Sequence, residues 1–187
     1  MRWIRAVLIT ISFAMLFGAG IYIFCNSILP GLNQNAKDAA LIPPLTGCQV
    51  EENKTFETTL LQQINTERRS QGLPLLSPDS KLFEAAEKHS FDMGCNHFFS
   101  HVNPEGQLIY DRIKAQGYIY STVAEVIFAG SGNMNAPQEA LKAWLNNAGY
   151  KAHLLDPAFT QVGIGAVHSQ GSPYEGYFTV VFASPAH

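Results

Sequence analysis

Residues 160–183 read TQVGIGAVHSQGSPYEGYFTVVFA, and this stretch decides the fold class. Its first part, from Thr160 to His168, is an apolar run interrupted by two glycines. Its second part, from Tyr177 to Ala183, is almost continuously apolar. The four residues 170–173, Gln-Gly-Ser-Pro, are typical of a turn. The stretch therefore predicts two paired strands that are joined by a turn and buried in the core.

Helical patterns precede these strands. Apolar residues at helical spacing predict helices over residues 55–70 and about 80–93, and two shorter ones around 108–113 and 137–145. A β-prone segment at 123–128 lies between the last two helices. Helices first and paired strands last favour an α+β domain in which helices pack on an antiparallel sheet.

The N-terminal segment 6–25 carries no charged side chain. At about 1.5 Å of rise per residue, it is long enough to cross a hydrocarbon core of about 30 Å. Arg2 and Arg5 precede it and no Lys or Arg follows until Lys37, which predicts a cytoplasmic N-terminus at 1–5 and a single-pass signal anchor at 6–25. A cleaved secretion signal is the alternative, since such signals also carry an apolar region. Lipid attachment at Cys25 is disfavoured by the bulky residues before it.

Residues 26–54 are rich in Pro, Gly, Asn and Ala without a sustained apolar period, which predicts a linker before one domain at 55–187. The predicted extracytoplasmic part contains two cysteines, Cys48 and Cys95. In an oxidising compartment two thiols can form a disulfide, and the alternative is two unrelated thiols. We predict the disulfide.

A series of sequence blocks resembles the bacterial type of the CAP superfamily, the cysteine-rich secretory, antigen 5 and pathogenesis-related-1-like proteins, also called SCP domains. The resemblance covers about residues 55–183. It implies a three-layer α/β/α sandwich with a central antiparallel sheet, preceded here by the predicted transmembrane helix. The blocks, in family order, are LQQINTER (61–68) with GLPL (72–75), AAEKHSFDM (85–93), FSHVNPEG (99–106), AEVI (124–127), AWLNNAGY (143–150) and LLDPAFTQVGIG (154–165).

The same resemblance implies a central cleft that holds a divalent metal such as zinc in some members. The family's first histidine matches His101 and its first glutamate matches Glu125, and imidazole and carboxylate together suit zinc. The second family histidine falls on Tyr150, and a second acidic position found in eukaryotic relatives falls on Asn147. A neutral phenol is a poor metal ligand at pH 7. His153, three residues after Tyr150, is the remaining candidate ligand, so we expect zinc to bind weakly at most.

The composition and the missing motifs argue against several classes of function. The net charge of −3 and the absence of a basic patch exclude a nucleic-acid-binding protein. No serine-hydrolase elbow, zinc-protease helix motif or phosphate-binding loop occurs in the sequence. These observations favour a membrane-anchored binding or interaction module of the cell envelope, with a lipid, peptide or cell-wall ligand and without enzymatic activity. The alternative is a metal-assisted hydrolase or peptidase that uses the cleft.

Overall fold

The computed structural model describes residues 47–186. The predicted cytoplasmic N-terminus at 1–5 and signal anchor at 6–25 lie outside the described residues. Of the helices between residues 47 and 186, none has the length and apolar character to cross a membrane.

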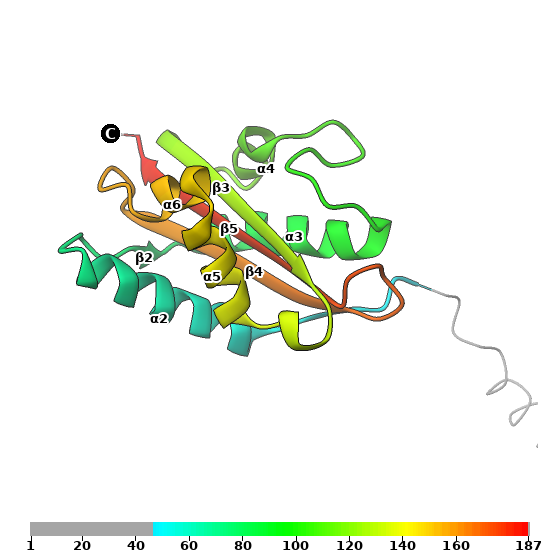
Figure 1. Ribbon diagram of the computed structural model, residues 1–187. Helices are drawn as coiled ribbons and strands as arrows, with labels where there is room; N and C mark the ends of the chain where they lie inside the picture. Colours follow the sequence, from blue (N-terminus) through cyan, green and yellow to red (C-terminus); the bar gives the residue numbers. More distant parts are fainter. Residues whose placement is uncertain (1–46, 187) are drawn as a thin grey trace, which may run out of the picture. The chain divides into compact units, whose positions relative to one another are not determined.

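A sheet forms the middle of the domain, with strand order β1-β4-β5-β3 (Figure 1). The strands β4 (Gln161–Ser169) and β5 (Gly176–Pro185) are antiparallel, with Ile164 opposite Val180, so the predicted strand pair is confirmed. The long strand β3 (Tyr120–Gly130) pairs antiparallel with β5 and forms one edge of the sheet. A two-residue strand, β2 (Ser77–Pro78), pairs parallel with β4 and is an exception to the expected antiparallel order.

The other edge is formed by β1 (Val50–Glu52), which pairs antiparallel with β4. The sequence predicted a linker over 26–54, yet β1 and the first residue of the following helix lie within that range. Three residues are too few to show the alternation of apolar and polar side chains that predicts a strand. This short strand is stabilised by its pairing with β4. The folded part of the chain therefore begins before residue 55.

Helices cover both faces of the sheet. On one face α2 (Lys54–Ser70), α5 (Pro137–Asn146) and α6 (Ala148–Leu154) pack around a core that contains Leu60 and Trp144. On the other face lie α3 (Ser80–Asn96) and α4 (Ile109–Ala115), with Leu82 and Ile113 buried. A short 3-10 helix, η2 (Gly132–Met134), follows β3. Figure 1 shows the resulting order of helix, sheet and helix layers.

Side chains of β5 alternate between the two layers. Phe178, Val180 and Phe182 join the core beside α2 and α5, whereas Val181 and Ala183 join the core beside α3 and α4. This alternation follows from the period of two in a strand, and burial on both faces explains the nearly continuous apolar sequence of β5.

The two glycines in β4 allow α3 to lie directly on the sheet. A Cβ atom added to Gly163 would collide with the backbone of Leu82, and one added to Gly165 would collide with the backbone of Ala86. Ser90, one turn further along α3, donates a hydrogen bond to the carbonyl oxygen of Gly165 at 2.9 Å. The glycines that interrupt the apolar run therefore mark the contact between helix and strand.

Candidate functional site

Three of the predicted site residues, His101, Glu125 and Tyr150, meet beside the edge strand β3. Glu125 lies in the middle of β3, opposite Val181 of β5. His101 lies in the loop between α3 and α4, and Tyr150 lies in α6 on the other layer. Because β3 has no further strand beside it, a loop from one layer and a helix from the other can both approach Glu125.

The three side chains form a hydrogen-bonded chain. His101 Nδ1 lies 2.8 Å from Glu125 Oε1, and His101 Nε2 lies 3.1 Å from the Tyr150 hydroxyl. A carboxylate accepts only, so Nδ1 carries a proton; in the neutral imidazole Nε2 then accepts from the Tyr150 hydroxyl. Glu125 is 2% exposed and His101 is 41% exposed, so the histidine and the half-buried tyrosine are the parts of the site that a ligand can reach.

Arg112 completes the site from α4. Its Nη2 lies 2.6 Å from Glu125 Oε2, while its Nη1 donates to the carbonyl oxygens of His101 and Gln107, each at 3.0 Å. The arginine therefore holds both the carboxylate and the loop that carries His101. Burial would raise the pKa of Glu125, but the hydrogen bond from His101 and the positive charge of Arg112 together lower it below its usual value. Glu125 is thus an ionised carboxylate at neutral pH.

Tyr150 is placed by the start of α6. The Asn147 side chain accepts hydrogen bonds from the backbone N–H groups of Gly149 and Tyr150, at 3.0 and 3.1 Å. Asn147 therefore caps the helix, a common role for asparagine, rather than contributing a ligand atom to the site. Burial, and the negative charge of Glu125, raise the pKa of the Tyr150 phenol, so the hydroxyl stays protonated and available as a donor.

The residues present do not fit a zinc ion. Both Glu125 oxygens are paired with His101 and Arg112, and both imidazole nitrogens of His101 are engaged as well. His153 lies in α6 and forms no hydrogen bond with His101 or Glu125 in the described part of the chain. Across residues 47–186 no three His, Cys, Asp or Glu side chains gather where they could hold a metal. We therefore derive no chemical step through a metal, and weak zinc binding stays a prediction.

Two further residues of the site were not predicted as such. Arg112 lies in the helix predicted around residues 108–113, but the sequence does not show which carboxylate a buried arginine will reach. His89 of α3 is fully buried, with Nε2 3.0 Å from the carbonyl oxygen of Ser100. Its Nε2 also lies 4.0 Å from Glu125, and burial lowers the pKa of His89, which leaves it neutral. It therefore supports the His101 loop without adding charge.

The predicted disulfide is confirmed. Cys48 and Cys95 are bonded, with their Cα atoms 5.2 Å apart. Cys95 lies in the last turn of α3 and Cys48 lies just before β1, so the bond connects the beginning of the described domain to the layer that carries His89.

An α/β/α sandwich with a histidine and a buried glutamate beside an edge strand defines an SCP-type domain. Comparison with known proteins agrees, since the model of the CAP family, described as the cysteine-rich secretory protein family, matches residues 61–182. The chain belongs to this family and is a CAP-domain protein of bacterial type.

Two relatives from Bacillus subtilis are similar in sequence. The protein YkwD is 35% identical over 114 residues, which is 61% of this chain and 43% of YkwD. The membrane protein YlbC is 32% identical over 111 residues, which is 59% of this chain and 31% of YlbC. The chain thus matches less than half the length of each of these two relatives.

Solved structures show the same fold. An extracellular protein with an SCP domain from Bacillus anthracis superposes with a TM-score of 0.60 at 28% identity, covering 69% of this chain and 40% of that one. An outer surface protein from Borrelia burgdorferi superposes with a TM-score of 0.66 at 19% identity, covering 74% of this chain and 99% of that one.

Proposed function

We propose that this chain is a binding module of the cell envelope that recognises its ligand at the His101–Tyr150 face of the cleft. The observation that carries the proposal is the closed hydrogen-bond chain from Tyr150 through His101 and Glu125 to Arg112. Both nitrogens of His101, both oxygens of Glu125 and both terminal nitrogens of Arg112 have partners, so the site is held in one arrangement before any ligand arrives. Preorganisation of this kind favours binding because little conformational freedom is lost on association.

The surroundings of His101 support a ligand with both apolar and hydrogen-bonding parts. Phe99 and Val102, on either side of the histidine in its loop, are 46% and 42% exposed. The ring of Phe99 lies 6.1 Å from that of Tyr174, which is exposed as well. Exposed apolar side chains around a polar centre are typical of binding surfaces. A lipid, a peptide or a wall component carries both kinds of group.

The location in the envelope is part of the proposal. Arg2 and Arg5 directly precede segment 6–25 and no Lys or Arg follows it until Lys37, which supports an anchor with the domain outside the cytoplasm. One B. subtilis relative is called a membrane protein, and the B. anthracis protein is described as extracellular. A reporter fused after His187 should be exported, and the mature protein should keep its own N-terminus. Cytoplasmic reporter activity contradicts the orientation, and an N-terminus beyond Gly20 contradicts the uncleaved anchor.

Co-sedimentation tests the binding role. The full-length chain in lipid nanodiscs, which accommodate the predicted anchor, is incubated with insoluble cell-wall polymer and with phospholipid vesicles that sediment. We expect one of these to retain the wild type and to lose the double variant His101→Ala/Tyr150→Phe. His168→Ala, at an exposed histidine of β4, is the matched control. Equal retention of wild type and double variant refutes the role of the cleft. Release of soluble fragments together with zinc that survives dialysis supports the metal-assisted hydrolase instead.

A further inference from the structure

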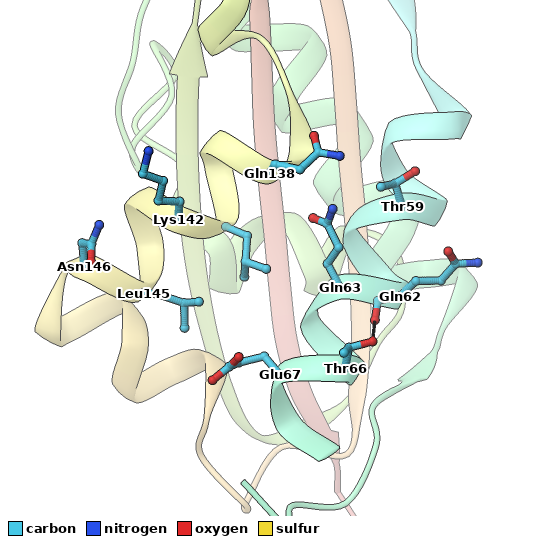
Figure 2. A pocket seen from close by; sticks show the side chains of 10 residues that line it. Thr59, Gln62, Gln63, Thr66, Glu67, Gln138, Lys142, Leu145 and Asn146 are labelled. Carbon is cyan, nitrogen blue, oxygen red and sulfur yellow. Dashed lines mark hydrogen bonds between the residues drawn. The ribbon is translucent and has the colours of Figure 1, made fainter. Parts of the chain in front are cut away.

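A second candidate site lies within the layer of α2, α5 and α6, in a groove of about 700 Å³ between α2 and α5. Its volume is in the range of small-ligand pockets. None of the residues that line it belongs to the hydrogen-bonded site of Tyr150, His101, Glu125 and Arg112. Figure 2 shows Gln63 and Glu67 directed from α2 towards α5, and Leu145 directed from α5 towards α2. The remaining residues that line the groove are Thr59, Gln62, Thr66, Gln138, Leu141, Lys142 and Asn146.

Side-chain amides dominate the polar lining. Four of them line the groove, Gln62 and Gln63 from α2 and Gln138 and Asn146 from α5, and none makes a side-chain hydrogen bond within residues 47–186. The Oε1 atom of Gln63 is buried and has no partner among the described residues. A buried acceptor without a partner costs about 1–3 kcal/mol, so a ligand donor towards which the Gln63 amide turns would recover that cost.

The rest of the lining consists of two threonines, two leucines and one residue of each charge. Leu141 and Leu145, one turn apart on α5, form an apolar strip. Glu67 and Lys142 contribute opposite charges from the two helices. The groove therefore favours a ligand that has no net charge, carries donors and acceptors, and presents a small apolar side chain.

We propose that the groove binds a short, extended and uncharged peptide segment. A side-chain amide has an NH₂ group that donates and a carbonyl oxygen that accepts. Each peptide unit of an extended chain likewise has one N–H donor and one C=O acceptor, so the two can pair. Two amides from each helix can therefore pair with a peptide backbone while the strip of Leu141 and Leu145 takes a side chain. The groove is separate from the His101–Tyr150 site of the proposed function.

The dimensions set the length of the ligand. From Thr59 to Glu67 the lining spans eight helical steps, or about 12 Å at 1.5 Å each. An extended chain rises about 3.3 Å per residue, so the groove accommodates about four residues. A fatty acyl chain fits less well, because it would leave the buried oxygen of Gln63 and its neighbouring amides without partners.

Nuclear magnetic resonance of the full-length chain in lipid nanodiscs tests the proposal, with the capped tetrapeptide acetyl-Ala-Leu-Ala-Ala-amide as the probe. We expect saturable shifts confined to backbone amides of α2 and α5. Gln63→Met keeps the side-chain length and removes the amide, and it should weaken binding at least about fivefold, a fold-change that corresponds to about 1 kcal/mol. Gln138→Met, at an exposed position, should weaken binding in the same direction even if Gln63→Met perturbs the fold.

Gln170→Met is the matched control, because Gln170 is an exposed amide that does not line the groove, and it should leave the peptide affinity unchanged. Absence of saturable shifts at millimolar peptide overturns the proposal. So does tighter binding of palmitate or of an N-acetylglucosamine tetramer at the same resonances. Shifts centred on the His101 loop would assign the peptide to the cleft and equally overturn the groove as its site, while leaving the proposed function in place.

Discussion

Replacement of Arg112 by Met is the most direct perturbation of the cleft, since it keeps much of the aliphatic stem and removes the guanidinium group. Arg112 and Glu125 form an ion pair at 2.6 Å, with side chains 6% and 2% exposed. Removal of one partner from a buried ion pair costs about 3–5 kcal/mol, because the other charge is left without compensation. The two carbonyl groups that Nη1 binds lose a donor as well. We therefore expect Arg112→Met to lower the free energy of unfolding by about 4 kcal/mol at pH 7.

The loss should depend on pH. In the wild type the pKa of Glu125 is lowered, so the contribution of the pair is present at neutral pH and is lost as the pH falls through that lowered value. In Arg112→Met the positive charge that lowers the pKa of Glu125 is gone, so burial raises this pKa relative to the wild type. Protonation of Glu125 at low pH then removes the unpaired buried charge. The difference between variant and wild type should therefore shrink from pH 7 to pH 4.

Urea unfolding at both pH values provides the measurement, and an exposed ion pair provides the control. Lys88 Nζ lies 2.7 Å from Glu84 Oε1, nearly the same separation, but the side chains are 60% and 54% exposed. Lys88→Met should cost less than about 1 kcal/mol. If Arg112→Met costs no more than Lys88→Met, the assignment of Arg112 as the residue that organises the cleft is wrong.

Three further outcomes are expected. Replacement of Cys48 and Cys95 by Ala should lower the free energy of unfolding by about 4 kcal/mol, as expected for a separation of 47 residues; unchanged urea midpoints would contradict this. Burial raises the pKa of Glu57 to about 7, because the folded protein favours the neutral carboxyl group. The protonated Glu57 therefore contributes its full stability below the ordinary carboxyl pKa, and this contribution is lost as the pH rises through 7. The loss amounts to about 3 kcal/mol, and Glu57→Gln should remove this pH dependence in unfolding measured from pH 4 to 9. Tyr150→His should tighten zinc binding at least about tenfold in calorimetry, and His101→Ala in that background should abolish the gain. If the wild type binds zinc as tightly as Tyr150→His, Tyr150 is not the reason for weak zinc binding.

Most of the elements could be predicted from sequence because their signals are local. The helix predicted at 55–70 is observed at 54–70, and the two strands of the opening motif pair as expected. The strand β1 could not be predicted, since three residues without a pattern become a strand only against β4. Its partner residues lie more than a hundred positions further along the chain.

The site could be predicted only in part. Family blocks indicated His101, Glu125 and Tyr150 as candidate site residues, and hydrogen bonds join the three in the structure. The blocks did not indicate Arg112, whose contact with Glu125 depends on how α4 packs beside β3. They also did not show that Asn147 caps α6, because this role depends on where α5 ends and on the backbone conformation of Asn147 between the two helices. Convergence of side chains from separate elements is a tertiary property that spacing along the chain does not contain.

The disulfide also determines how the domain would carry mechanical load. Tension applied to the chain before Cys48 would act on a short edge strand, whose few hydrogen bonds to β4 could open one after another. The covalent bond to Cys95 diverts that tension into α3, which lies on the sheet along β4 and β5. A pull at this end is therefore resisted by the whole interface between helix and sheet, and β1 is shielded from being peeled away.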